Sequence, residues 1–515
     1  MELIHHFDHG VYLAPDRDCL VMGEDRWTYR EAQRITMRVA SALHRDGVRE
    51  GTRVAVLSPN DPRAFMCVLG AIRAHMVWVP LNPRSSNETL IAILEKFDCQ
   101  VLIFNSMYED FAAEAKQKLA GLTRLYCVDK ETPLATSVEQ WTCSASEDFS
   151  LPPADPQDVI AIASTSGTTG APKGVLQTHQ FFEHVVASNL AVMPADQPPH
   201  YLAAGPLTHA AGIGTFPNFV RGGTVFVLAA AKPLLIAEAI QEYRITATVL
   251  PPTVIYGMLA EPTIRNYDFS SLRYFWYGTA PTSPDKVREA IEVFGPCMVS
   301  GWGQSEVVCG TFLSAQDLVK DGKIVSEKRL ASCGRKFPFT DVAVMNPEGE
   351  LLGVGEPGEL VIRCSGLMKG YYDDPEATAE VSRFGWHHTG DVGYFDEEGY
   401  FYIVDRIKDM IISGGFNIFP GEIEHVLFTH AAVEDCAVIG IPDEKWGERI
   451  HAVVQLKAGA TVSAEELLSL CRARLAGMKT PKSLEFRDEL PRSPVGKTLK
   501  RALRDEYWAG HSRKV

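Results

Sequence analysis

The sequence lacks the signals of a membrane protein, a secreted protein and a nucleic-acid-binding protein. It has no window of about 18 uninterrupted apolar residues, and its first residues do not combine a positive start with an apolar core. Lys and Arg number 50 against 65 Asp and Glu, a net charge of −15, and no basic block is present. We therefore expect a cytoplasmic protein with no integral membrane segment and no nucleic-acid partner.

Several metal and catalytic signatures are also missing. The 11 cysteines are scattered without a Cys-x-x-Cys pair, which argues against a zinc site and a disulfide framework, so most should be reduced and buried. No His-Glu-x-x-His or Gly-x-Ser-x-Gly sequence occurs, which argues against a zincin and a serine hydrolase of the elbow type. With these motifs absent, the strongest functional signal in the sequence is a loop rich in hydroxyl side chains and glycine.

That loop is Ser164-Thr-Ser-Gly-Thr-Thr-Gly-Ala-Pro-Lys-Gly174, which follows an apolar run at residues 159–163 that reads as a buried strand. Hydroxyl groups, glycines that let backbone N–H groups approach closely, and the charge of Lys173 suit a polyphosphate ligand. The loop is not a Walker P-loop, because Pro172 precedes Lys173 and Gly174 follows it. Taken alone, the same composition would also fit a solvated linker.

The rest of the chain predicts an α/β multidomain fold. Apolar strands alternate with helical stretches before the loop and again after it, which is typical of two helix-covered, mostly parallel sheets. The predicted strands of this part span residues 54–57, 77–80, 100–104, 224–228 and 246–250, and the predicted helices span residues 64–75, 88–97, 234–243 and 287–294.

The character of the sequence changes at about residue 335. Short strands at residues 342–345, 359–363 and 400–404 are separated by turn residues, which predicts a small antiparallel β-barrel-like region over residues 335–404. The remaining residues predict a small α+β domain, with helices at 421–428 and 464–476 and strands at 436–439, 451–455 and 483–486.

The loop at residues 165–174 closely resembles the signature loop of the adenylate-forming superfamily, which contains acyl- and aryl-CoA ligases, luciferases and peptide-synthetase adenylation domains. Further segments resemble family motifs in the family order, from the loop to Lys497, so that the resemblance covers nearly the whole chain. They are Pro206-Leu-Thr-His-Ala-Ala-Gly212, Tyr277-Gly-Thr-Ala-Pro281, Gly301-Trp-Gly-Gln-Ser-Glu306, His388-Thr-Gly-Asp391, the run from Asp405-Arg-Ile-Lys to Glu424, and Pro491-Arg-Ser-Pro-Val-Gly-Lys497.

The resemblance implies a nucleotide site. By this resemblance Trp302 would lie by the base, Ser305 would contact phosphate and Glu306 would help to hold Mg²⁺. Asp391 would bind the ribose, because a carboxylate can accept hydrogen bonds from its two vicinal hydroxyls. Trp302 and Ser305 replace the Tyr and Thr that are commoner in the family, and both keep the chemical type. The residues expected to bind ATP or AMP are Thr165, Ser166, Gly167, Thr168, Thr169, Gly170, Lys173, Gly278, Thr279, Ala280, Gly301, Trp302, Gly303, Ser305, Asp391 and Arg406.

The resemblance also implies the catalytic and mobile parts. Lys497 would ease the approach of the substrate carboxylate to the α-phosphate, and His209 would lie beside that carboxylate, although a lone histidine is as often a satisfied core residue. A large domain of residues 1–404 and a small mobile domain of residues 405–515 would meet at a hinge, Asp405. The residues expected along the acyl and CoA channel are Ile213, Tyr277, Val308, Lys408, Gly414 and Gly415.

We therefore predict a carboxylate–CoA ligase that uses ATP, CoA and Mg²⁺ and forms an acyl-AMP intermediate. The acid is predicted to be medium-chain, alicyclic or aryl. Ile213 stands near the position where some long-chain enzymes carry an aromatic gate, so a gated fatty-acyl tunnel is not supported. Transfer to a carrier-protein thiol is an alternative, but no carrier domain follows Lys497, which favours free CoA. A non-catalytic nucleotide sensor is another alternative. A sensor could lose Lys497 and Glu306, but both are present, which favours an enzyme. The sequence leaves a homo-oligomer open.

Overall fold

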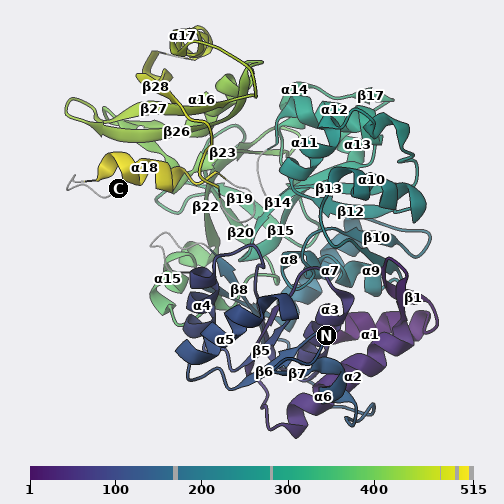
Figure 1. Ribbon diagram of the computed structural model, residues 1–515. Coiled ribbons are helices and arrows are strands. Elements are labelled where there is room, and N and C mark those ends of the chain that lie inside the picture. The colour runs from purple at the N-terminus through teal and green to yellow at the C-terminus, as the bar shows by residue number, and fades with distance from the viewer. Residues whose placement is uncertain (166–171, 279–281, 476, 493–497, 510–515) are drawn as a thin grey trace.

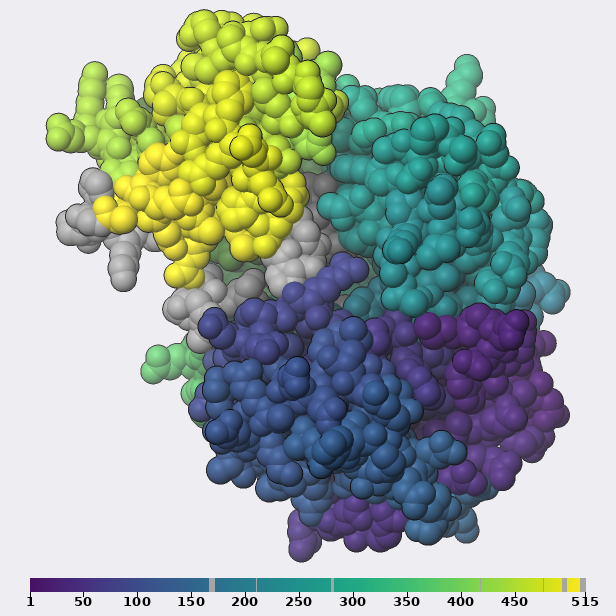
Figure 2. Space-filling view, viewed as in Figure 1, coloured from purple at the N-terminus to yellow at the C-terminus, as the bar shows by residue number. Residues whose placement is uncertain are grey.

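The chain folds into three visible lobes, with the C-terminal lobe set apart from the other two (Figures 1 and 2). The computed structural model describes residues 1–165, 172–278, 282–475, 477–492 and 498–509. Two large sheets, a small four-stranded sheet and a two-stranded hairpin account for the strands before residue 407, and a further sheet belongs to the C-terminal lobe.

The first large sheet has eight strands in the order β21-β9-β8-β4-β3-β5-β6-β7. Its inner strands β3, β4 and β5 are parallel and almost wholly buried, as expected of strands covered by helices on both faces. The strands are β3 (Arg53–Leu57), β4 (Val77–Pro80), β5 (Val101–Phe104), β6 (Arg124–Cys127), β7 (Thr136–Ser137), β8 (Val159–Thr165), β9 (Lys173–Thr178) and β21 (Gly370–Tyr371).

The second large sheet has nine strands in the order β18-β15-β14-β13-β12-β10-β11-β1-β2. The N-terminal strand β1 pairs with β11 in parallel, which joins the start of the chain to this distant sheet. The strands are β1 (Asp18–Met22), β2 (Asp25–Thr28), β10 (His200–Ala203), β11 (Thr224–Val227), β12 (Ala247–Leu250), β13 (Tyr274–Tyr277), β14 (Met298–Gln304), β15 (Val307–Leu313) and β18 (Arg335–Lys336).

The largest hydrophobic core lies between the two sheets. It combines strand residues of both sheets with α2 (Tyr29–Arg45), α3 (Pro62–Arg73) and α7 (His179–Val192). Helix α2 begins with a capping box of Thr28 and Glu31, and α3 packs tightly on it because a Cβ at Gly70 would lie 2.6 Å from Val39 Cβ. This core fixes the two sheets relative to each other.

Other helices cover the outer faces of the sheets. Helices α4 (Asn87–Lys96) and α5 (Glu109–Lys118) cover the eight-stranded sheet, and α10 (Pro233–Glu242), α11 (Pro252–Ala260) and α12 (Pro284–Phe294) cover the nine-stranded sheet. The remaining elements of these lobes are α1 (Leu3–Leu13), α6 (Val138–Thr142), α8 (Ala210–Ile213), α9 (Phe216–Phe219), α13 (Ala315–Leu318), α14 (Glu327–Leu330), η1 (Ser106–Tyr108), η2 (Ile264–Asn266), β16 (Val319–Lys320) and β17 (Lys323–Ile324).

The small sheet differs from the prediction. The expected barrel-like region is an open antiparallel sheet in the order β19-β20-β22-β23, in which the outer strands β19 and β23 do not pair with each other. Four strands are too few to close around a packed interior, so the apolar face packs on Trp302 and Val307 of the nine-stranded sheet instead. The elements are β19 (Asp341–Met345), β20 (Gly358–Arg363), α15 (Pro375–Glu380), η3 (Arg383–Gly385), β22 (His387–Phe395) and β23 (Phe401–Arg406).

The C-terminal lobe is an α+β unit with its own core of residues from α16, α17 and the strands β24 to β27. Its order is η4 (Ile407–Asp409), β24 (Ile411–Ser413), β25 (Phe416–Ile418), α16 (Pro420–Phe428), β26 (Val433–Asp443), β27 (Gly447–Leu456), α17 (Ala464–Arg474), η5 (Gly477–Lys479), β28 (Ser483–Phe486) and α18 (Lys500–Trp508). The predicted fold class is thus confirmed apart from the barrel. The hinge at Asp405 stays a prediction.

The structure bears on the predictions about cysteines and membrane spans. Most of the cysteines are buried free thiols, as their scattered positions predicted. As for membrane spans, the described part of the chain contains no helix with the length and apolarity needed to cross a bilayer.

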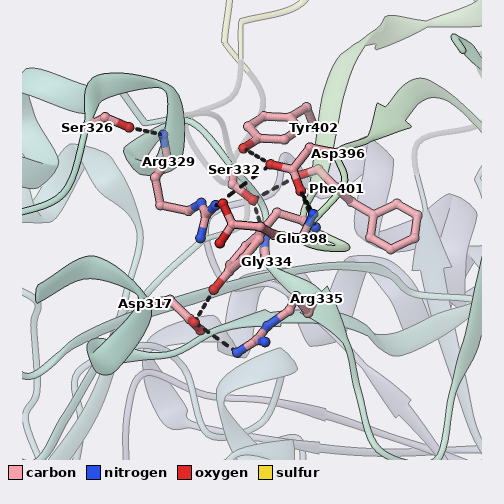
Figure 3. A network of polar contacts seen from close by, with 11 residues as sticks. Asp317, Ser326, Arg329, Ser332, Gly334, Arg335, Asp396, Glu398, Phe401 and Tyr402 are labelled. Atoms are coloured by element: carbon pink, nitrogen blue, oxygen red, sulfur yellow. Dashed lines mark hydrogen bonds and ion pairs between the residues drawn. The ribbon is translucent and has the colours of Figure 1, made fainter. Parts of the chain in front are cut away.

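A network of polar contacts fixes the β22–β23 hairpin against the nine-stranded sheet (Figure 3). Arg329 pairs with Glu398 at 2.7 Å and stacks its guanidinium over the Tyr400 ring at 3.3 Å from the ring centroid. The Tyr400 hydroxyl donates to Asp317, which also pairs with Arg335 at 3.0 Å. The hairpin is therefore held by side chains as well as by strand pairing.

We predict that Arg329→Ala lowers the thermal unfolding midpoint, because it removes a stacked cation and a partly buried ion pair worth about 1–3 kcal/mol together. Arg244→Ala is the matched control, since the Arg244–Asp268 pair is exposed on both sides and should contribute little. Equal midpoints for the two variants would contradict the structural role of the network.

Candidate active site

The buried carboxylate of Asp391 is the centre of the candidate site. One carboxylate oxygen accepts hydrogen bonds from Trp302 Nε1 at 2.8 Å and from Gln304 Nε2 at 3.0 Å, and the other lies 3.1 Å from Arg406 Nε. The Asp391 side chain is 6% exposed and that of Arg406 is 39% exposed. The end of β14, the middle of β22 and the end of β23 therefore meet at one charged group.

The turn before Asp391 is shaped by a glycine and by a glutamate. Gly390 has a φ of 71°, in the left-handed region, and its N–H donates to Glu359 Oε1 at 2.9 Å. The second oxygen of Glu359 lies 2.7 Å from His388 Nδ1. Glu359, on the neighbouring strand β20, thus sets the course of the His388-Thr-Gly-Asp391 motif. Sequence reasoning missed it, because a glutamate at a strand start carries no distinctive signal.

The predicted phosphate loop connects the antiparallel strands β8 and β9. Thr165 and Lys173 are paired at the base of the connection, and Gly174 follows where a Cβ would come within 2.5 Å of the Phe97 ring. Between Thr165 and Lys173, the loop residues predicted to bind phosphate lie outside the described residues. They are Ser166, Gly167, Thr168, Thr169 and Gly170.

Tyr371 joins the base of this loop to Glu306. The Lys173 ammonium lies 4.9 Å from the Tyr371 ring centroid, and the Tyr371 hydroxyl donates to Glu306 Oε1 at 2.8 Å. Burial and the Glu306 charge raise the pKa of Tyr371, so the phenol stays a donor at neutral pH. The predicted metal residue and phosphate lysine thus converge on a tyrosine that the sequence did not single out.

The predicted acyl side lies around β13, β14 and α8. Gly278 is buried and Gly301 is half-buried, and the indole of Trp276 lies against both. A Cβ added at Gly278 would lie 3.2 Å from the indole, and one added at Gly301 would lie 3.0 Å from it. Tyr277, predicted to line the channel, is instead buried in the helix-covered core of the nine-stranded sheet. Alternation along a strand sends neighbouring side chains to opposite faces, which gives Trp276 the inner face.

The other predicted acyl-side and base-side residues that the structure describes lie on α8 and in the β14–β15 hairpin. Ile213 packs against the core between the large sheets, and Val308 is 36% exposed. Gly303 lies too close to the Val308 carbonyl to accept a side chain, and the Ser305 carbonyl accepts a hydrogen bond from Gln177 at 3.0 Å. Thr279 and Ala280 lie outside the described residues.

His209 stands at the N-terminus of α8, half-buried. Burial lowers its pKa to about 4, so the imidazole is neutral at physiological pH. A neutral imidazole can donate a hydrogen bond to a carboxylate without adding a charge to it. The predicted place of His209 beside the acid stays a prediction.

Two of the residues predicted for the C-terminal lobe, Gly414 and Gly415, form the turn between β24 and β25. Gly414 and Gly415 have φ values of 59° and 82°, and Gly414 N–H donates to the Trp446 carbonyl at 2.8 Å. Lys408 lies in η4, and burial together with the nearby Arg406 lowers its pKa. Lys497 lies outside the described residues.

The candidate site combines the buried carboxylate of Asp391 with the base of the predicted phosphate loop, where Lys173 and Glu306 both contact Tyr371. Several of the residues predicted to bind a nucleotide therefore have defined partners in the fold. Comparison with known proteins identifies the class of protein. Residues 7–372 match the family described as AMP-binding enzyme, and residues 422–497 match the AMP-binding enzyme C-terminal domain.

Individual relatives agree with this match. The chain is 38% identical to a feruloyl-CoA synthase of an Amycolatopsis species, covering 96% of this chain and 97% of that protein. It is 34% identical to the medium/long-chain-fatty-acid–CoA ligase FadD8 of Mycobacterium tuberculosis, covering 97% and 89%. The structure of the amide bond synthetase McbA from Marinactinospora thermotolerans superimposes with a TM-score of 0.89 at 27% identity, covering 98% and 100%.

The chain belongs to the AMP-binding enzyme family. The matches confirm the resemblance to the acyl- and aryl-CoA synthetase branch and the predicted activity class, an AMP-forming acid–thiol ligase.

We predict that Asp391→Asn raises the KM for ATP by about tenfold or more, because charged hydrogen bonds contribute about 1.5–3 kcal/mol and the neutral amide loses the Arg406 pair. Asp321→Asn, in an exposed turn, is the control that changes the same charge elsewhere. An unchanged KM in a folded Asp391→Asn protein would remove Asp391 from the nucleotide site.

A second prediction concerns pH. Burial lowers the pKa of four histidines from 6.5 to about 4, namely His6, His179, His209 and His387. Between these pH values the unfolded chain binds more protons than the folded one, so stability is full above pH 6.5 and falls as the pH drops toward 4.

Thermal midpoints at pH 7 and pH 5 test this. His387→Gln should reduce the difference between the two midpoints, whereas His425→Gln should not, because the His425 side chain is 53% exposed. The same difference in both variants would show that the buried histidines do not cause the acid sensitivity.

Proposed function

We propose that this enzyme converts a carboxylic acid, preferably an aryl acid, into its CoA thioester through an acyl-AMP intermediate. The observation that carries the proposal is the convergence of Trp302, Gln304 and Arg406 on the buried Asp391. A carboxylate can accept hydrogen bonds from both vicinal hydroxyls of a ribose, so Asp391 suits that role. ATP and CoA are the co-substrates used across the CoA ligase branch of the family.

The phosphate end of the nucleotide would lie between the loop of residues 164–174 and Glu306. One Glu306 oxygen is held by Tyr371, which leaves the other for a cation. Mg²⁺ is commonly bound by one or two carboxylates together with substrate phosphates, so a single oriented glutamate fits it. When bound, Mg²⁺ would offset negative charge on the departing pyrophosphate.

In the first half-reaction, an oxygen of the acid's carboxylate forms a bond to the α-phosphorus and the bond to pyrophosphate breaks. Lys497 is proposed to bring the two anions together, because a cation reduces their mutual repulsion in a cleft with little water. Neutral His209 would hold the second carboxylate oxygen. The result is a mixed anhydride, acyl-AMP, which is a reactive acyl donor.

In the second half-reaction, the CoA thiol forms a bond to the acyl carbon and AMP leaves. We propose that the lobe of residues 405–515 rotates about Asp405, so that Lys497 leaves the site and the Gly414-Gly415 hairpin enters it. Two glycines without side chains would leave room for a narrow thiol arm. One cleft then serves both reactions. The cytoplasm supplies ATP and CoA and keeps the thiols of this chain reduced, which supports the predicted location.

The preference for an aryl acid rests on two facts. The relative with 38% identity over nearly the full chain is a feruloyl-CoA synthase. In addition, the flat indole of Trp276 lies along the backbone of Gly278 and Gly301, where it would offer an aromatic wall to a planar substrate. Medium-chain and alicyclic acids stay alternatives, because the fatty-acid ligase FadD8 is 34% identical.

A panel of acids tests the proposal, with AMP and acyl-CoA measured together. We expect CoA-dependent AMP formation with hydroxylated cinnamic or benzoic acids at a higher kcat/KM than with octanoic or cyclohexanecarboxylic acid. A preference for octanoic acid would contradict the aryl assignment. Adenylate formation without any acyl-CoA would contradict transfer to CoA, and nucleotide binding without turnover would contradict an enzyme altogether.

We predict that Lys497→Ala suppresses pyrophosphate release from ATP and free acid and largely spares thioester formation from supplied acyl-AMP. The reason is that the lysine is needed where two anions meet, and the second half-reaction has no such encounter. Arg492→Ala, on the same C-terminal segment, controls for loss of a positive charge. Equal loss of both half-reactions in Lys497→Ala would overturn the division of roles.

A further inference from the structure

A buried ion cluster lies at the junction between the hinge and the C-terminal helix. Lys500, the first residue of α18, places its ammonium 2.9 Å from Glu424 Oε1 and 4.0 Å from Asp405 Oδ1. The side chains of the three residues are 20%, 14% and 6% exposed. Charges with so little contact with water persist only when they are paired.

Each carboxylate of the cluster is also tied to a backbone N–H group. Glu424 Oε1 accepts a hydrogen bond from Val438 N at 2.7 Å, and Asp405 Oδ2 accepts one from Gly421 N at 2.6 Å. Gly421 permits this close approach, because a Cβ there would lie 2.5 Å from the Val404 carbonyl. The cluster therefore links the end of β23, helix α16, strand β26 and helix α18.

The ammonium of Lys500 is the only cation shown to pair with these two carboxylates among the described residues. Burial alone would lower its pKa, but Glu424 and Asp405 outweigh that effect and raise it, so Lys500 stays charged. Burial raises the pKa of both Glu424 and Asp405. Loss of the lysine charge would leave two carboxyl groups without their shared partner.

A second contact from the same helix reaches the residues just beyond the hinge. Arg504 Nη1 donates to the Lys408 carbonyl in η4 at 3.1 Å. Arg504 follows Lys500 by four positions, which places both side chains on one face of α18. The adjacent face of the helix packs Leu503 into a core with Ala437 and Ile439. One face of α18 thus contacts Asp405 and Lys408 at the predicted hinge.

We propose that Lys500 is a positioning residue for adenylation, because it fixes the first turn of α18 to the hinge and so sets where Lys497, three residues earlier in the chain, enters the site. The inference rests on the proposed function, in which Lys497 serves adenylation and Asp405 is the pivot. It assigns to Lys500 no contact with a substrate. Its effect is on how often Lys497 reaches the reacting oxygens.

The test compares the two half-reactions in Lys500→Met, Lys500→Arg and Arg501→Met. Methionine keeps an unbranched side chain without the charge, arginine keeps the charge, and Arg501 is an exposed neighbour whose pair with Asp505 is open to solvent. The measurements are ATP–pyrophosphate exchange, thioester formation from supplied acyl-AMP and CoA, the KM for ATP, and the thermal midpoint.

We expect Lys500→Met to lower kcat for exchange by about tenfold to a hundredfold, since small misplacements of a reacting group have effects of that size. The KM for ATP should stay unchanged and thioester formation should fall by less than about threefold. Lys500→Arg should recover most of the exchange, and Arg501→Met should match the unsubstituted enzyme. Normal exchange in folded Lys500→Met, or an equal fall in both half-reactions, would overturn the proposal.

If Lys500→Met does not fold, Lys500→Met combined with Glu424→Gln removes the cation together with its nearest charge, and the same comparison decides. The failure of this inference is distinguishable from the failure of the proposed function. If the unsubstituted enzyme forms no acyl-CoA from any acid, the proposed function fails. If it forms acyl-CoA and Lys497→Ala loses exchange while Lys500→Met keeps it, only the inference about Lys500 fails.

Discussion

The pairing of one buried carboxylate, Asp391, determines how the parts of this protein meet. A charge at that depth must be matched by donors, and the donors come from two other strands, with Trp302 and Gln304 on β14 and Arg406 on β23. The nine-stranded sheet and the small sheet are consequently locked together at the candidate site. The Arg329–Tyr400 stack secures the far end of the same hairpin.

Neighbouring residues at the end of β23 serve opposite sides of the strand. Arg406 points to Asp391 in the candidate site, whereas Asp405 points to the N–H of Gly421 in the C-terminal lobe. Side chains alternate along a strand, so two adjacent positions can join two lobes. Asp405 and Arg406 thus stand where the small sheet ends and the C-terminal lobe begins, which is where the hinge is predicted.

The parts of the fold that the sequence predicted are those with strong local patterns. The buried strands β3, β4 and β5 and the helix α3 were visible in runs of apolar residues, because parallel strands and central helices are covered on all sides. The barrel prediction was wrong, because short alternating strands do not reveal whether a sheet closes or packs its open face on a neighbour.

The site shows the same division. The motif residues Glu306, Asp391 and Arg406 were predicted as site residues because their order along the chain matches a family. Tyr371 and Glu359 were missed, since each acts through a partner far away in the sequence and neither belongs to a motif. Tyr277 was placed in the channel, but the face of β13 on which it lies depends on strand register, which puts Trp276 toward the inner side instead.

The sequence by itself thus determined the class of chemistry, because its motifs resemble those of the adenylate-forming superfamily and stand in the same order. Only the tertiary structure decided which groups orient these residues. Orientation depends on hydrogen bonds between segments that are distant in the chain, such as Tyr371 to Glu306, and on buried charges such as the Lys500–Glu424 pair. Such contacts leave no local pattern, because each partner satisfies the other across space rather than along the sequence.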